Sequence, residues 1–153
     1  MAFSFLKGLQ KLIARPHVFL YRISSGKIGG WMNGSRVLLL TTTGRKTGKP
    51  RTTPMAFIHQ NDEYLVAAAA SGSAQNPAWF LNLERTPEAT VELDGKQIKV
   101  RAAITSGGER DQLYELFKAT YPGFTMVESW TTRKIPVIRL QPIMPESLSI
   151  NLV

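Results

Sequence analysis

The fold of this chain is indicated most clearly by residues 36–59, which read RVLLLTTTGRKTGKPRTTPMAFIH. Residues 36–43 are rich in leucine and β-branched side chains, a composition typical of a buried strand. Two glycines and a proline follow within residues 44–50, and these residue types mark a turn. Residues 51–59 are again rich in threonine and apolar side chains. The stretch therefore predicts two antiparallel strands joined by a tight turn.

Four further strands are predicted after this hairpin, at residues 64–70, 90–93, 96–104 and 135–140. Two of them are joined by Asp94-Gly95, which is a strong signal for a short hairpin turn. Tight turns join most of the six strands, and the chain shows no regular alternation of strand and helix. This pattern favours a mainly β, α+β fold: a small antiparallel β-barrel of about six strands with helices on its outside.

Two helices are predicted between these strands. Asn76 is a favourable N-cap residue and Pro77 suits the first helical position, so one helix is expected to begin there. Ser106 followed by Glu109 has the spacing of a capping box, which predicts a second helix running to about residue 120. Both helices carry apolar side chains that would pack on the barrel.

The N-terminal part of the chain is predicted to be a separate amphipathic segment, residues 1–28, followed by the barrel domain at residues 29–153. Within residues 3–14, apolar side chains recur every three or four positions while lysines share another face, which predicts an amphipathic helix. Arg15-Pro16 is expected to end or kink it. Two interpretations stay open: the helix packs on its own domain, or it lies on an anionic lipid surface.

Basic side chains are concentrated in the first part of the chain. The 153 residues include 19 Lys or Arg and 11 Asp or Glu, which gives a net charge of +8. Residues 1–61 hold 10 of the basic residues and no acidic one, and residues 62–153 hold the rest. This asymmetry predicts that one end of the protein meets an anion: phosphate, polycarboxylate, nucleic acid or a membrane surface.

The composition excludes several classes of protein. The chain has no cysteine, so a disulfide scaffold, a zinc finger and a thiol nucleophile are excluded. His17 and His59 are far apart, so no metal site is expected, and no GxSxG motif indicates a serine hydrolase. No apolar run is long enough to predict a transmembrane helix, and early basic residues argue against a cleavable signal peptide. These features are compatible with a cytoplasmic protein.

The turn at residues 44–51, GRKTGKPR, carries four cations: Arg45, Lys46, Lys49 and Arg51. Its glycines allow the backbone N–H groups to approach an anion closely, and the Arg and Lys side chains add charge. The Walker pattern GxxxxGK[ST] is absent. The turn is either a solvated hairpin tip or an anion-binding loop, and its uninterrupted sequence context favours the second interpretation.

Four segments resemble the deazaflavin (F420)-dependent nitroreductase family: LLLTTTGRKTGKPRTTPM at residues 38–55, NPAWFLNL at 76–83, TYPG at 120–123 and IPV at 135–137. Their order and spacing agree with the family from about residue 29 to residue 142. The resemblance implies a split β-barrel reductase that uses coenzyme F420, an 8-hydroxy-5-deazaflavin. This coenzyme carries hydride and ends in a phosphate and several glutamates.

The resemblance also implies where the coenzyme would bind. The basic turn would neutralise its tail, residues 53–55 would run under the ring, and the backbone of residues 67–72 would flank the ring. In the NPxWxxNL helix, Asn76 is expected mainly as a cap and Trp79 mainly as a packing residue. The coenzyme-binding residues so predicted are Arg45, Lys46, Arg51, Thr53, Pro54, Met55, Ala67, Ala69, Ala70, Ser71, Gly72, Asn76, Trp79 and Asn82.

The acceptor pocket implied by the resemblance would be lined by Tyr121, Phe124, Val127 and Trp130, although core packing is an equally open interpretation for the aromatic residues Phe124 and Trp130. Only Tyr121 keeps a phenol in this register, so it is the candidate proton donor. The otherwise apolar wall favours a hydrophobic acceptor such as a quinone, a nitroaromatic compound or an enone. It argues against nitroimidazole activation.

One departure from the family lies in the ring-flanking loop. Family members commonly have Ser-Lys or Ser-Asn where this chain has Ala69-Ala70, so a hydroxyl near the ring is lost and backbone N–H groups would take its place. The absence of an Asp/His catalytic pair does not argue against an enzyme, because the coenzyme itself carries the hydride.

Other ligands and partners stay open beside an F420-dependent reductase. A related split barrel could bind flavin mononucleotide (FMN), or the protein could bind deazaflavin without strong catalysis; haem is disfavoured because no histidine is well placed. Nucleic-acid binding is not expected, since Phe57 is the one aromatic residue within residues 36–61. Residues 1–15 could hold a cytoplasmic protein on the inner face of the plasma membrane. A homodimer is a further possibility.

Overall fold

The computed structural model describes residues 16–22, 24, 26, 31–32 and 35–144 of the chain. The amphipathic helix predicted at residues 3–14 lies outside the described residues. So do residues 27–30, where the boundary between the N-terminal segment and the barrel domain is predicted. Residues 16–22 are helical. Within them Tyr21 is buried, and its hydroxyl lies 3.2 Å from the carbonyl oxygen of Val37 and 3.1 Å from that of Glu92. This short helix therefore packs on the sheet.

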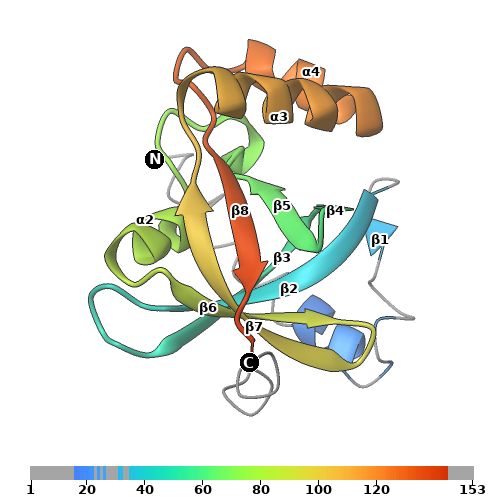
Figure 1. Ribbon diagram of the computed structural model, residues 1–153, viewed down its shortest axis with the longest axis vertical. Helices are drawn as coiled ribbons and strands as arrows, with labels where there is room; N and C mark the ends of the chain where they lie inside the picture. The colour runs from blue at the N-terminus through green and yellow to red at the C-terminus, as the bar shows by residue number, and fades with distance from the viewer. Residues whose placement is uncertain (1–15, 23, 25, 27–30, 33–34, 145–153) are drawn as a thin grey trace, which may run out of the picture.

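Antiparallel strands form one sheet that curls into a half-barrel (Figure 1), as the sequence predicts. The strands of the described residues are β1 (Trp31–Met32), β2 (Ser35–Thr43), β3 (Pro50–Ala56), β4 (Ile58–Gln60), β5 (Glu63–Ala67), β6 (Glu88–Leu93), β7 (Lys96–Ile104) and β8 (Val137–Pro142). Their order along the sheet is β1-β2-β6-β7-β8-β5-β4, and β3 pairs with β2. The hairpin of β2 and β3 has the register Thr43↔Pro50 through Val37↔Ala56.

Helices cover the ends and sides of this sheet. They are η1 (Ala70–Gly72), α2 (Ala78–Arg85), α3 (Gly107–Thr120) and α4 (Gly123–Ser129). In Figure 1, α3 and α4 lie together across one end of the sheet, and α2 lies beside β6 at its flank. No helix of the described residues is long and apolar enough to cross a membrane.

Strand β2 is buried on both of its faces, which explains why its sequence is a continuous apolar run. Leu38 and Leu40 point into the half-barrel, where they join a core with Met55. Val37 and Leu39 alternate with them and are also buried. A second cluster lies beneath α3 and α4 and consists of Leu65, Tyr114, Phe117, Ile135 and Val137.

The predicted strands are confirmed, although one of them is divided in two and another ends earlier than expected. The strand expected at residues 51–59 is divided at Phe57, whose side chain is buried and whose N–H bonds to the carbonyl of Arg36 at 3.3 Å. The strand expected at residues 64–70 ends at Ala67. After it, Ala70 and Ser71 have positive φ angles of 47° and 51°, which no strand accommodates.

The predicted N-cap residue is wrong for the first helix, whereas for the second helix the N-cap residue is confirmed and the capping box is wrong. Pro77 is the N-cap of α2, with φ −65° and ψ 156°, rather than its first residue, and Asn76 lies outside the helix. Ser106 is the N-cap of α3 but makes no side-chain capping bond. Glu109, the expected partner in a capping box, instead pairs with Arg139 at 3.1 Å. The sequence analysis also did not predict α4 as a separate helix.

Candidate functional site

The basic turn, residues 44–51, is a tight connection between β2 and β3. The N–H of Gly44 donates to the carbonyl of Lys49 at 2.8 Å, and the N–H of Gly48 donates to the carbonyl of Gly44 at 2.7 Å. Gly48 has a φ of +70°, which favours glycine. A β-carbon at Gly44 would lie 3.0 Å from the Lys49 carbonyl oxygen. Both glycines are therefore required by the shape of the turn.

Helix α2 holds the basic turn in place through Asn82, whose side chain is buried. The Nδ2 group of Asn82 donates to Thr42 Oγ1 at 3.0 Å, and its Oδ1 accepts from the backbone N–H of Arg45 at 3.1 Å. Arg85 Nη1 donates to the carbonyl of Arg45 at 2.9 Å. Asn82, predicted as a coenzyme residue, thus supports the turn that carries the cations.

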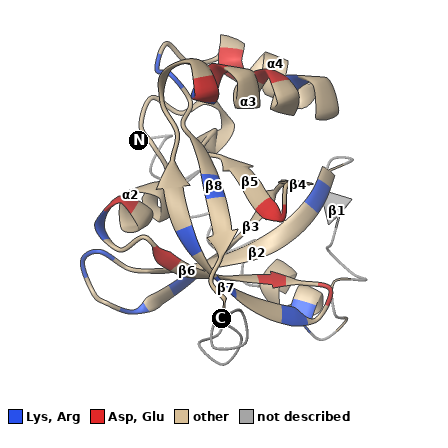
Figure 2. Cartoon of the chain, in the orientation of Figure 1, with Lys and Arg blue, Asp and Glu red and all other residues tan. Residues whose placement is uncertain are grey.

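The cations of the basic turn have no carboxylate partner among the described residues. Other basic residues of the first part of the chain do: Arg22 pairs with Glu92 at 2.8 Å and Arg36 with Asp94 at 3.4 Å. In Figure 2, the Lys and Arg positions of the β2–β3 turn and of the end of α2 lie together at one side of the molecule. Within the described residues, the four cations of this turn therefore form a cluster that no carboxylate neutralises.

A second feature is the 68–76 loop, which connects β5 to α2 and contains the predicted ring-flanking residues. Ala69 has right-handed helical angles (φ −73°, ψ −37°), while Ala70 and Ser71 have positive φ. A right-handed residue followed by a left-handed one forms a nest, in which successive backbone N–H groups converge on an anion or a carbonyl oxygen. Within the described part of the chain, no acceptor lies on the N–H groups of Ala69, Ala70 and Ser71.

This loop touches α4 closely at Gly72, where φ is +74°. A β-carbon at Gly72 would lie 2.6 Å from the β-carbon of Trp130, so only glycine fits there. The predicted coenzyme loop and the predicted acceptor wall are therefore in direct contact.

Arg133 is a residue of this region that the sequence analysis missed. Its guanidinium donates four hydrogen bonds to the 68–76 loop, including one to Asn76 Oδ1 at 2.8 Å. Burial lowers the pKa of the Arg133 guanidinium below its usual value. A lone arginine between two threonines and a lysine carries no motif, so nothing in the sequence indicated it.

Helix α2 connects the two features. The 68–76 loop precedes its first turn and the basic turn is held at its last turn, and the eight-residue helix itself is about 12 Å long. Figure 1 shows the two connections on either side of α2. Trp79, at 8% exposed, packs in the half-barrel core, as the sequence analysis favoured.

The remaining predicted ring contacts lie on β3. Thr53 and Met55 point to the same face as Leu40 and Leu38, with which they are paired across the β2–β3 ladder. Pro54 points to the opposite face. Thr53 is half-buried on the face that it shares with Met55, whereas Met55 is 9% exposed and packs in the half-barrel core, so Met55 offers a ring only a small exposed surface.

The predicted acceptor wall comes from the end of α3 and from α4. The hydroxyl of Tyr121 donates to the carbonyl of Phe57 at 2.7 Å, and burial raises the pKa of this tyrosine. The ring of Phe124 packs against Tyr114, Phe117 and Tyr121. Trp130, in contrast, is 57% exposed. Phe124 thus contributes to the second core, while Trp130 is open to a ligand.

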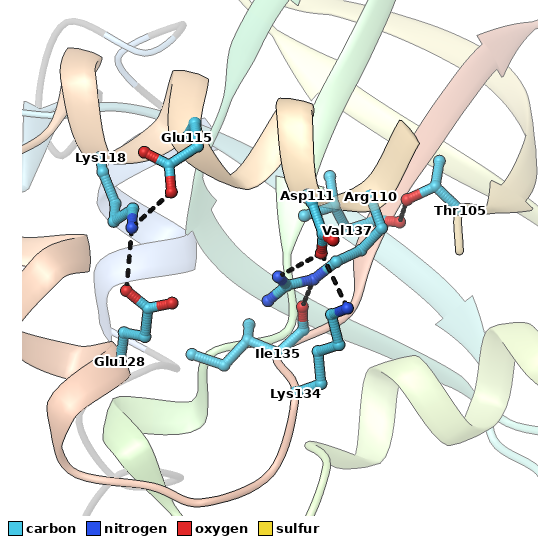
Figure 3. A network of polar contacts seen from close by, with 9 residues as sticks. All are labelled: Thr105, Arg110, Asp111, Glu115, Lys118, Glu128, Lys134, Ile135 and Val137. Atoms are coloured by element: carbon cyan, nitrogen blue, oxygen red, sulfur yellow. Dashed lines mark hydrogen bonds and ion pairs between the residues drawn. The ribbon is translucent and has the colours of Figure 1, made fainter. Parts of the chain in front are cut away.

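A polar cleft of about 610 Å³ lies on the other side of α4, between α3 and the connection to β8. Figure 3 shows that the acidic residues that line it, Asp111, Glu115 and Glu128, are all paired with basic side chains. Asp111 lies 3.2 Å from Arg110 and 2.8 Å from Lys134, and these hydrogen bonds lower the pKa of Asp111. Lys118 joins Glu115 on α3 to Glu128 on α4. No group of His, Asp and Glu side chains suited to a metal ion occurs in the described ranges.

Comparisons with known proteins agree with this architecture. The family described as F420H(2)-dependent quinone reductase matches residues 13–142. The F420H(2)-dependent quinone reductase Rv1261c of Mycobacterium tuberculosis is 34% identical over 137 residues, which cover 87% of this chain and 91% of that protein.

Two solved structures are also similar. An F420-H2-dependent reductase, FDR-A, has 30% identity and a TM-score of 0.63, covering 69% of this chain and 93% of its own. A structure described as a domain-swapped dimer has 25% identity and a TM-score of 0.65, covering 92% of this chain and all of its own.

The half-barrel and these similarities together define an F420-dependent oxidoreductase of the split-barrel class. The chain belongs to the F420H(2)-dependent quinone reductase family. The resemblance drawn from its sequence motifs is thereby confirmed, and quinone reductase replaces the looser label of nitroreductase. The residues present fit coenzyme F420, because a set of unpaired cations suits its anionic tail and a set of unpaired N–H groups suits its ring carbonyls.

Proposed function

We propose that this chain transfers hydride from reduced F420 to a hydrophobic quinone, with the coenzyme lying along α2. The observation that carries the proposal is the placement of two unlike binding features at the two ends of this helix. Unpaired backbone N–H groups lie before its first turn, and unpaired cations lie at its last turn. A coenzyme with a polar ring at one end and a polyanionic tail at the other matches this arrangement.

The tail would bind at the basic turn. Lys46 and Arg51 have exposed side chains with no carboxylate partner in the described ranges. Arg45 is oriented by its bonds to Asn82, with Nη1 at 3.4 Å from Oδ1. Arginine binds phosphate and carboxylate groups with two parallel bonds, and lysine adds a point charge. The turn therefore supplies both kinds of contact to a phosphate and several glutamates.

The ring would lie against the 68–76 loop and β3. The bound coenzyme supplies the hydride, and the chain provides orientation, shielding from water and hydrogen bonds. The N–H groups of Ala69, Ala70 and Ser71 would hold the polar edge of the ring. Thr53 and Met55 would contact its face from β3.

The acceptor would lie against α4, where Val127 and Trp130 offer apolar surface beside Gly72. We propose Tyr121 as the proton donor to the reduced acceptor. A tyrosine hydroxyl is protonated at neutral pH, and burial, which raises the pKa of Tyr121, keeps it in that state. Giving up that proton requires the hydroxyl to leave the Phe57 carbonyl that it contacts at 2.7 Å.

The test is a titration of the purified protein with oxidised F420 and with FMN, followed by assays of reduced F420 with a quinone, a nitroaromatic compound and an enone. We expect F420 to bind more tightly than FMN and the quinone to be the best acceptor. Lys46→Ala and Arg51→Ala should weaken F420 binding, while Lys99→Ala, an exposed cation on β7, should not. Unchanged binding in both turn variants would contradict the site assignment, and tighter FMN binding would favour the alternative coenzyme.

We also propose that the N-terminal segment brings this cytoplasmic protein to an anionic membrane, where a lipid-soluble quinone would be reached. Phe19 and Leu20 are 63% and 40% exposed on the helical residues that follow 1–15. Exposed apolar side chains next to a basic amphipathic sequence favour binding at a lipid surface. Co-sedimentation with anionic vesicles that persists after deletion of residues 1–15 and replacement of Phe19 and Leu20 by serine would contradict this role. A homodimer is proposed by analogy with the domain-swapped neighbour and is tested by sedimentation velocity.

A further inference from the structure

The guanidinium of Arg133 donates all four of its hydrogen bonds to one short segment of the chain. Its Nε donates to the carbonyl of Ser73 at 2.7 Å, and its Nη1 donates to Asn76 Oδ1 at 2.8 Å. Its Nη2 donates to the carbonyls of Ala68 and Ala69 at 3.0 and 2.8 Å. All four acceptors belong to the 68–76 loop, and no carboxylate pairs with Arg133 in the described residues.

The residues that follow Arg133 are hydrogen-bonded to α3 and to the residue after β5. Figure 3 shows Ile135 bonded to α3, where Arg110 Nε donates to the Ile135 carbonyl at 2.7 Å. The adjacent pair of Lys134 and Asp111, at 2.8 Å, is exposed and contributes little to this attachment. The next carbonyl, that of Pro136, accepts from the N–H of Ala68 at 2.9 Å. Arg133 therefore reaches the loop from a fixed base.

The geometry of the peptide group gives these bonds a consequence. In a trans peptide the C=O of one residue and the N–H of the next point in opposite directions. Because Arg133 holds the carbonyls of Ala68 and Ala69, the N–H groups of Ala69 and Ala70 are turned away from it. These are two of the three N–H groups that have no acceptor within the described part of the chain.

We propose that Arg133 is a positioning residue that orients the peptides 68–69 and 69–70 so that the N–H groups of Ala69 and Ala70 face the deazaflavin ring. This inference rests on the proposed function, since it assumes that the ring lies at the 68–76 loop. Arg133 does not touch the reacting atoms. It orients the backbone N–H groups that would bind the ring.

Two further observations support this role. Ala70 and Ser71 have positive φ angles that L-residues adopt unfavourably, so the loop needs contacts from outside to keep this conformation. A guanidinium bonded to a carbonyl also polarises the peptide, which makes the N–H at its other end a better donor. Residues 69 and 70 are both alanines, so at these positions the loop offers backbone donors and no side-chain donor.

The test compares Arg133→Met with Lys134→Met. Both variants remove one positive charge from the same segment, but Lys134 makes no contact with the 68–76 loop and its pair with Asp111 is exposed. Two quantities are measured: the F420 dissociation constant, and the hydrogen-exchange rates of the Gly72 and Ser73 amides in the protein without coenzyme. These amides bond to the Ala69 and Ala70 carbonyls at 3.0 Å and so report the loop conformation.

For Arg133→Met we expect the F420 dissociation constant to rise about tenfold, which corresponds to roughly the free energy of one charge-assisted hydrogen bond. The amides of Gly72 and Ser73 should exchange faster than in the wild type. Lys134→Met should match the wild type in both quantities. Arg133→Lys keeps the charge but cannot span four acceptors, and should fall between the two. If Arg133→Met does not fold, Arg133→Lys still tests the proposal through the same two quantities.

Wild-type affinity in Arg133→Met and Arg133→Lys would overturn the proposal. Weaker binding with unchanged exchange would also overturn it, because Arg133 would then act by charge and not by positioning. Failure of the wild type to bind F420 would instead contradict the proposed function on which the inference rests.

Discussion

The buried amide of Asn82 on α2 holds the backbone of Arg45 in the basic turn, with Oδ1 3.1 Å from the Arg45 nitrogen. The same side chain donates to Thr42 Oγ1 at 3.0 Å on the preceding strand. One asparagine, 3% exposed, therefore connects the core of the half-barrel to the cluster of unpaired cations.

Replacing this residue tests that connection. Asn82→Ala should lower the free energy of unfolding by about 1–3 kcal/mol, because it leaves the Arg45 N–H and the Thr42 hydroxyl without their partner. Urea denaturation measures this change, and F420 titration should show weaker binding. Asn82→Asp keeps the acceptor for Arg45 but places a carboxylate beside the cations, so it should lose less stability than Asn82→Ala while still weakening F420 binding. An Asn82→Ala protein with unaltered F420 affinity would show that the turn does not need this support.

Gly72 should not tolerate a β-carbon. Gly72→Ala places that atom 2.6 Å from the Trp130 β-carbon at a φ of +74°, so α4 or the loop must move. We expect a loss of stability of about 1–3 kcal/mol together with weaker F420 binding. Gly123→Ala is the matched control, because nothing lies within 4 Å of the added atom. Equal melting temperatures for the two variants would contradict the close contact of loop and helix.

Tyr121→Phe separates the proton donor from the packing residue. If Tyr121 gives a proton to the reduced acceptor, kcat with a quinone should fall by about a hundredfold while F420 affinity stays unchanged. Whether or not Tyr121 donates a proton, loss of its hydrogen bond to the Phe57 carbonyl should lower the free energy of unfolding by about 1 kcal/mol. A kcat equal to that of the wild type would leave Tyr121 with the structural role alone.

Glu63 should make the stability of the fold depend on pH. Two hydrogen bonds from Arg139, at 2.7 and 2.8 Å, hold the pKa of Glu63 below its usual value. A carboxyl with a lowered folded-state pKa stabilises the protein above the pKa of an ordinary glutamate, about 4.3, and loses this effect as the pH falls through its folded-state pKa.

Glu63→Gln should therefore lower the free energy of unfolding by about 1–2 kcal/mol at pH 7, and the difference from the wild type should shrink below about pH 4. Urea denaturation at several pH values measures this difference. A difference that is the same at pH 7 and at pH 3 would contradict the assigned pairing of Glu63 with Arg139.

Much of the fold could be predicted from local sequence patterns. The β2–β3 hairpin and the β6–β7 hairpin were expected because glycine-containing turns interrupt strand-forming runs, and such signals lie within a few residues of each other. The errors at Asn76 and Glu109 have one cause. Both side chains suit a local cap, yet each bonds to an arginine distant in sequence, Arg133 and Arg139. Tertiary contacts of this kind leave no local pattern.

The candidate site was predicted unevenly for the same reason. The cations of the basic turn are adjacent in sequence and could be recognised together. Arg133 could not, because its importance lies in carbonyl groups some 60 residues away, and every residue has a carbonyl group. The supporting role of Asn82 likewise became visible only when α2 was placed beside the turn.

The central claim is that the basic turn binds the anionic tail of F420 while the 68–76 loop binds its ring. It is tested most directly by titrating wild-type protein and Arg51→Ala with F420 and with the same deazaflavin lacking the phosphate and glutamates. The account predicts that the wild type binds F420 more tightly than the tailless compound, and that Arg51→Ala weakens F420 binding but not binding of the tailless compound. Equal weakening for both compounds, or none for either, would contradict it.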